Sequence, residues 1–161
     1  MGERRRGATL LTLFPELDAF AKAHGLTVGP GATRTELTAK SEGGGRAVTM
    51  TQGSITHPRG GGKLFHFRLT FEPYAKKPSW MLTPTGATRW EGNAPAQVAR
   101  EEVPGWATFS APLLQFGDEV KTHWQLKLGE QDRLYLEALE LVSPRAWELA
   151  WATLDAVWVS T

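Results

Sequence analysis

Basic and aromatic residues are interleaved through the middle of the chain, between residues 57 and 90. Lysine and arginine neutralise phosphates and release counterions, while aromatic rings stack on unpaired bases for about 1–3 kcal/mol per base. The segment from Tyr74 to Trp80 combines two rings with Lys76 and Lys77. The pattern predicts a surface for single-stranded DNA or RNA. The residues predicted to form it are Arg59, Lys63, His66, Arg68, Tyr74, Lys76, Lys77, Trp80, Arg89, Trp90, Lys121, His123 and Lys127.

The same residues also allow other interpretations. Lysines beside a proline, as in Lys76-Lys77-Pro78, are common in ordinary solvated turns, and most tryptophans are core or interface anchors. A curved sheet under a long helix can enclose an apolar, tryptophan-lined pocket, which would suit a small-molecule-binding module. A tryptophan-rich helix can also serve as the contact surface of a protein-interaction or assembly module. These two functions are the alternatives to nucleic-acid binding.

The sequence contains fragments of enzyme motifs, but none has the neighbouring residues and secondary structure that its chemistry requires. The run from Gly60 to Lys63 is followed by Leu64 and a predicted strand, whereas a phosphate-binding loop requires Ser or Thr and a helix there. The four histidines lack the close helical spacing of a zinc hydrolase, and His66 with His123 would still need a third ligand. We therefore expect a protein that is not an enzyme and that uses neither a metal nor another cofactor.

The charge is distributed unevenly along the chain. Residues 1–90 hold 13 Lys and Arg against 6 Asp and Glu, whereas residues 91–161 hold 5 against 11, and the net charge is +1. Such asymmetry either marks a basic face for a polyanion or lets the two halves neutralise each other in the fold. The chain has no cysteine and no long apolar run, so we expect a cytoplasmic protein that does not cross a membrane.

Helical spacing and turn residues predict the N-terminal elements. A helix is expected over residues 14–24, with Pro15 at its first position and Gly25 as its left-handed stop. Strands are expected over residues 34–40 and 46–52. The clearest strand covers residues 63–72, where four apolar residues alternate with a polar, basic set. Two further strands, over residues 80–83 and 87–90, are expected at an edge or interrupted, because Pro78 and Pro84 flank them.

The second half predicts two helices among further strands. Asn93 is expected to cap a short helix over residues 94–102. Strands are expected over residues 106–111 and 119–128. Residues 133–142 are expected to form the return strand or, because Leu, Glu and Ala favour helices, a helix instead. Ser143 and Pro144 are expected to start a long apolar helix that runs to about Trp158.

This order predicts one α+β domain over residues 8–161, after a basic flexible tail over residues 1–7. The fold class is a largely antiparallel sheet with an N-terminal helix, a short middle helix and a long C-terminal helix. His66-Phe67-Arg68-Leu69 is similar to His123-Trp124-Gln125-Leu126, which is consistent with a strands-then-helix unit used twice. The apolar face of the last helix predicts a homodimer interface formed by Trp147, Trp151 and Trp158.

The predicted order of strands, helix, strands and long capped helix resembles the Whirly and PUR-type folds that bind single-stranded nucleic acids. The likeness is carried by the Asn93 helix, the Ser143-Pro144 start and the apolar face that includes Trp147 and Trp158. It covers residues 34–158 as a pattern, without a diagnostic motif. The resemblance implies single-strand binding and association through helices.

Overall fold

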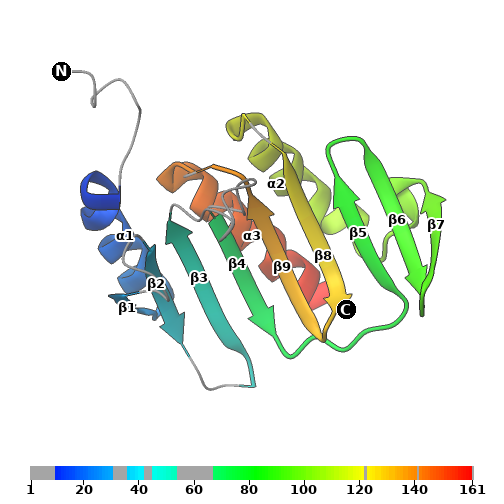
Figure 1. Ribbon diagram of the computed structural model, residues 1–161, viewed down its shortest axis with the longest axis horizontal. Helices are drawn as coiled ribbons and strands as arrows, with labels where there is room; N and C mark the ends of the chain where they lie inside the picture. The colour runs from blue at the N-terminus through cyan, green and yellow to red at the C-terminus, as the bar shows by residue number, and fades with distance from the viewer. Residues whose placement is uncertain are drawn as a thin grey trace, which may run out of the picture.

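The computed structural model describes residues 10–30, 36–41, 45–53, 67–121, 123–140 and 142–160. These residues form an α+β fold in which a nine-stranded antiparallel sheet carries three α-helices (Figure 1). The fold class predicted from the sequence is thereby confirmed. The helices are α1 (Leu10–His24), the 3-10 helix η2 (Arg100–Glu102), α2 (Trp106–Glu119) and α3 (Pro144–Ser160). The strands are β1 (Thr27–Pro30), β2 (Glu36–Ser41), β3 (Ala47–Gly53), β4 (Phe67–Glu72), β5 (Ser79–Thr83), β6 (Gly86–Glu91), β7 (Ala94–Val98), β8 (Trp124–Glu130) and β9 (Arg133–Ala138).

The sheet is open, with the strand order β1-β2-β3-β4-β9-β8-β5-β6-β7. Three hairpins build its right-hand part in Figure 1, and the β8–β9 hairpin is inserted between β4 and β5. This insertion places the last two strands of the chain in the middle of the sheet, because β9 pairs with β4 and β8 pairs with β5. Residues far apart in sequence, such as Arg68 and Glu137, therefore become direct neighbours.

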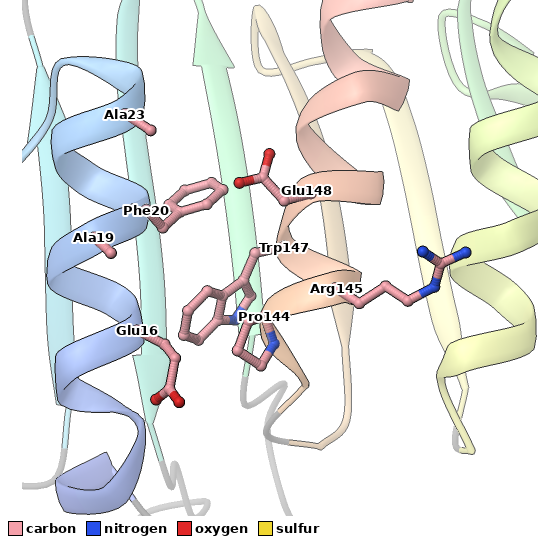
Figure 2. A pocket seen from close by; sticks show the side chains of 8 residues that line it. All are labelled: Glu16, Ala19, Phe20, Ala23, Pro144, Arg145, Trp147 and Glu148. Carbon is pink, nitrogen blue, oxygen red and sulfur yellow. The ribbon is translucent and has the colours of Figure 1, made fainter.

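The core lies between the sheet and the helices, which all sit on the same face (Figure 2). In β4 the alternating residues Phe67, Leu69 and Phe71 are fully buried on this side, as the two-residue period predicts. Their partners across the sheet, such as Leu136 on β9, continue the same apolar layer. Phe109, Leu113 and Phe116 cover it from α2, at the spacing of one helical face.

The predicted start of the C-terminal helix and the end of the N-terminal helix are confirmed. The Ala146 N–H donates to the Ser143 Oγ at 3.2 Å, and Pro144 is the first residue of α3. Gly25 has a φ of 72° and follows the last residue of α1. The beginning of α1 differs from the prediction, because the helix starts at Leu10 and Pro15 lies inside it.

The middle of the chain folds differently from the prediction. Residues 94–102 were predicted as a helix capped by Asn93, but they form β7 and the short η2. Gly92, with a φ of 63°, and Asn93 make a two-residue turn between the Glu91 and Ala94 pair, which commits this segment to a hairpin. The helix starts later, at Trp106, where a strand was expected, because Phe109, Leu113 and Phe116 bury one helical face.

Two other expectations are corrected. Strands β5 and β6 are not at an edge, because β5 pairs with β8 and β6 pairs with β7. The two prolines lie outside the strands, since Pro78 precedes β5 and Pro84 lies in the turn between β5 and β6. One feature of the predicted internal repeat is wrong, because Asn93 does not cap a helix. A helix still follows strands twice, as α2 after β5–β7 and α3 after β8–β9. In the described part of the chain, no helix is long and apolar enough to cross a membrane.

Candidate nucleic-acid interface

The sheet has one face that none of the described helices covers (Figures 1 and 2). Side chains alternate along a strand, so residues between the buried positions of β4 point to this uncovered face. Their partners in register across β9, β8, β5 and β6 share it. From β4 to β6 the uncovered face carries Arg68, Thr70, Arg133, Tyr135, Glu137, Gln125, Lys127, Met81 and Trp90.

Three cationic side chains converge on Tyr135 at the centre of the uncovered face. The ring centroid lies 5.0 Å from the Arg68 Cζ, 4.9 Å from the Arg133 Cζ and 5.8 Å from the Lys127 Nζ. Tyr135 is buried. Cations within about 6 Å of an aromatic ring are attracted by its quadrupole. We call Arg68, Lys127, Arg133 and Tyr135 the cation cluster.

Two carboxylates partly neutralise the cation cluster. Two guanidinium nitrogens of Arg68 contact Glu137 Oε1, and the Lys127 Nζ lies 3.0 Å from Glu130 Oε1. The Tyr135 hydroxyl donates to Glu130 Oε2 at 2.9 Å. Three formal positive charges therefore face two negative ones. The sequence predicted a basic face, but the structure shows a mixed one with a small positive excess.

Burial raises the pKa of Tyr135 in the cation cluster and of Glu137 beside it. Burial raises the pKa of Glu137 above its usual value, although the Arg68 guanidinium acts in the opposite direction. Burial, together with the hydrogen bond to Glu130, also raises the pKa of the Tyr135 hydroxyl far above its ordinary value. Tyr135 is therefore a hydrogen-bond donor at neutral pH, and Glu137 accepts a proton more readily than a free glutamate does.

One donor and one acceptor of the uncovered face remain unpaired within the described part of the chain. The Arg133 Nη2 donates to Gln131 Oε1 at 2.8 Å, but its buried Nε has no acceptor. On β8 the buried Gln125 Oε1 has no donor. A buried polar atom without a partner costs about 1–3 kcal/mol. Because both atoms are buried, a ligand with complementary groups would reach them only after these side chains move.

Trp90 is the exposed aromatic residue of this face. It pairs with Ser79 across β5 and β6 and keeps 36% of its surface exposed. A hollow of about 200 Å³ lies between Trp90, Met81 and Glu130, and a second one of about 460 Å³ lies between Trp90, Lys77 and Gly92. The indole is thus accessible from two sides, which is the arrangement that a stacking platform needs.

The structure brings together only part of the predicted surface. Arg68 and Lys127 flank Tyr135, and Trp90 lies further along the same face. Trp80 and Arg89 pair with each other on the opposite, helix-facing side, with the Arg89 Cζ 6.0 Å from the Trp80 ring. Tyr74 is buried, and its ring lies 6.1 Å from that of Trp158.

The remaining predicted residues lie in loops or outside the described residues. Lys76 and Lys77 are exposed before β5, and the Lys77 Nζ donates to the Gly129 carbonyl at 3.1 Å. Lys121 and His123 are exposed before β8. Arg59, Lys63 and His66 lie outside the described residues, so their placement stays a prediction.

Sequence reasoning missed Tyr135, Arg133 and Glu137. They alternate along β9, so a two-residue period was present in the sequence as a signal. The segment reads Arg133-Leu-Tyr-Leu-Glu-Ala, with apolar residues between the three polar ones. Its role depends on the pairing of β9 between β4 and β8, which the sequence does not display.

The three tryptophans predicted as a dimer interface all contact the core of their own chain. Trp147 is fully buried, with its ring 5.7 Å from that of Phe20. Trp151 and Trp158 are half-buried, and the Arg46 Cζ lies 5.7 Å from the Trp151 ring and 5.5 Å from the Trp158 ring. Trp147 therefore belongs to the core of this chain, and dimerisation through Trp151 and Trp158 stays a prediction.

Comparison of the chain with protein-family models, curated proteins and solved structures finds no match. These comparisons identify no family for the chain, and the structure shows only that its fold is α+β. The Whirly and PUR-type resemblance extends only to this coarse fold class. Within the described residues, no group of three or more His, Asp or Glu side chains is placed to hold a metal ion.

Proposed function

We propose that this protein binds single-stranded nucleic acid on the uncovered face of its sheet. The observation that carries the proposal is the convergence of Arg68, Lys127 and Arg133 on Tyr135, on the same face as the exposed Trp90. Phosphates would lie against the cation cluster, and an unpaired base would stack on Trp90. An open sheet face accepts a flexible single strand more readily than a rigid duplex does.

The carboxylates restrict how a phosphate can approach. Arg68 uses two of its five N–H donors on Glu137, so its remaining donors can still reach a phosphate. The Arg133 Nε has no acceptor among the described side chains, but it is buried, so a phosphate would reach it only after the side chain moves. Because three cations and two carboxylates share the site, we expect moderate affinity with little sequence preference. Backbone contacts of this kind carry no base information.

The proposal is tested by titration with a fluorescein-labelled oligothymidine of about 12 nucleotides, within the usual range of single-strand site sizes. We expect tryptophan quenching and increased anisotropy at about 50 mM salt. With three cations engaged, the logarithm of the affinity should fall with the logarithm of the salt concentration with a slope of about −2. A titration without any binding at low salt would contradict the proposal.

Trp90→Ala provides the specific test of stacking. It should weaken binding by about 1–3 kcal/mol, which is the usual contribution of one base–aromatic stack. The matched control is Leu114→Ala, which removes another exposed apolar side chain, from α2 on the helical side of the molecule. Equal affinities for the two variants would show that Trp90 is not the stacking platform.

A further inference from the structure

The helical side carries an apolar groove between α1 and α3, remote from the uncovered face (Figure 2). Its volume is about 370 Å³, and its floor is formed by the buried rings of Phe20 and Trp147. Ala19 and Ala23 line it from α1 and are exposed. They stand four residues apart, on the same row of the helix, so no bulky side chain closes this part of the groove.

The charges around the groove are predominantly acidic. Glu16 on α1 and Glu148 on α3 both line it, and Glu16 makes no ion pair with any described residue. Glu148 Oε1 accepts a hydrogen bond from His24 at 3.0 Å. Arg145 extends away from the groove toward α2, where its Nε lies 3.1 Å from Glu119 Oε2 (Figure 2). The groove therefore presents an apolar floor with two carboxylates beside it, of which Glu148 is hydrogen-bonded to His24 and Glu16 has no ion pair among the described residues.

The floor also contains a polar group without a partner. Trp147 is fully buried, and its indole N–H has no acceptor among the described residues. Buried indole N–H groups usually find a hydrogen-bond partner, and leaving one unpaired costs about 1–3 kcal/mol. An acceptor that enters the groove after a small movement of the surrounding side chains would remove this cost.

We propose that this groove binds a basic amphipathic helix of a partner protein. Apolar side chains at helical spacing would cover Phe20 and Trp147, and lysine or arginine beside them would meet Glu16 and Glu148. A second copy of this chain is a poorer occupant. Two identical grooves packed face to face would bring the carboxylates of Glu16 and Glu148 against each other.

The probe is a labelled helical peptide of leucine and lysine, about 14 residues or four turns long, with leucine along one face. A matched peptide carries glutamate in place of every lysine. In fluorescence anisotropy, we expect the glutamate peptide to bind about tenfold more weakly or worse. Binding should also move the indole N–H resonance of Trp147 in ¹H–¹⁵N spectra. This resonance is assigned with Trp147→Phe.

Two arginine substitutions locate the binding site. Ala19→Arg places a long cationic side chain in the groove and should weaken lysine-peptide binding about tenfold or more. Ala152→Arg makes the same change at an exposed alanine of α3 that does not line the groove, and it should leave binding unchanged. Trp90→Ala should also leave binding unchanged, which separates this proposal from nucleic-acid binding on the other face.

Three outcomes would overturn the proposal. The first is equal binding of the lysine and glutamate peptides. The second is equal weakening by Ala19→Arg and Ala152→Arg. The third is a concentration-dependent dimer in sedimentation that Ala19→Arg abolishes, because a second copy of the chain would then be the occupant.

Discussion

Arg68 on β4 and Glu137 on β9 lie directly opposite each other, and two guanidinium nitrogens contact Glu137 Oε1 at 2.7 and 2.8 Å. The two partners are unequally exposed: the Arg68 side chain is 41% exposed and the Glu137 side chain 3%. The pair thus joins a buried carboxylate to a cation in contact with water. This asymmetry makes Arg68 the member that a ligand can reach, and Glu137 the member whose isolation would be costly.

Arg68→Leu should destabilise the fold by about 1–3 kcal/mol at neutral pH, because it leaves a buried carboxylate without its charged hydrogen-bond partner. Removing Arg68 takes away an influence that lowers the pKa of Glu137. The pKa of Glu137 in the folded protein then rises further above its value in the unfolded chain. The loss in the free energy of unfolding should therefore shrink as the pH falls through the folded-state pKa of Glu137. Urea unfolding near pH 7 and near pH 4.5 measures the effect.

The double variant Arg68→Leu with Glu137→Leu is the control for that experiment. It removes both members of the pair and should recover much of the lost stability, since no buried charge remains. A loss that is equal at both pH values, or that persists fully in the double variant, would assign the effect to packing around Tyr135 instead.

Nucleic-acid binding should strengthen as the pH falls. Burial raises the pKa of Glu137, so acidification protonates this carboxyl before an ordinary glutamate and frees Arg68 for a phosphate. We expect the affinity for oligothymidine to increase from about pH 8 to about pH 5 at constant ionic strength. Glu137→Gln mimics the neutral carboxyl and should bind more tightly at pH 8, with a weaker pH dependence. A pH profile shared by both proteins would exclude this role of Glu137.

The raised pKa of Tyr135 predicts that the free energy of unfolding decreases at alkaline pH. Burial, and after it the hydrogen bond to Glu130, raises the pKa of the Tyr135 hydroxyl above the ordinary tyrosine value of about 10. The contribution of the neutral Tyr135 hydroxyl to the free energy of unfolding is complete below the pKa that this hydroxyl has in the unfolded chain. It decreases as the pH rises above that value, because the hydroxyl ionises first in the unfolded chain. Urea unfolding from about pH 8 to about pH 11.5 should therefore show a steeper decline for the unsubstituted protein than for Tyr135→Phe. Parallel curves would contradict the prediction.

The irregular end of β8, where the pairing register shifts between Leu128 and Glu130, should tolerate no side chain at Gly129. Its φ is 98°, and an added Cβ would lie 2.6 Å from the Lys76 carbonyl oxygen. Gly92 also has a positive φ, of 63°, but has no atom within 4 Å of such a Cβ. Gly92→Ala should cost about 1 kcal/mol for the backbone conformation alone. Gly129→Ala should cost about 1–3 kcal/mol more because the backbone must move, and similar melting temperatures would refute this.

Local sequence patterns were sufficient to predict secondary structure where it depends only on residues within the same segment. The two-residue period of Phe67, Leu69 and Phe71 predicted a strand with one buried face, and Ser143-Pro144 predicted the start of α3. They were insufficient between residues 93 and 111. There, Asn93 suits a helix cap and a tight turn equally well, and pairing of β7 with β6 decided between them. The helix over Trp106–Glu119 required the apolar layer of the sheet as its partner.

The sequence by itself determined the α+β class, the strand nature of β2 to β6, and the cap and apolar character of α3, because these follow from periodicity and turn chemistry within a few residues. The tertiary structure alone decided which charged residues meet. Arg68, Lys127 and Arg133 gather on Tyr135 only because β9 lies between β4 and β8. The same pairing brings Glu137 and Glu130 beside these cations. Strand order is set by long-range burial and hydrogen bonding across the sheet, so no local pattern could display it.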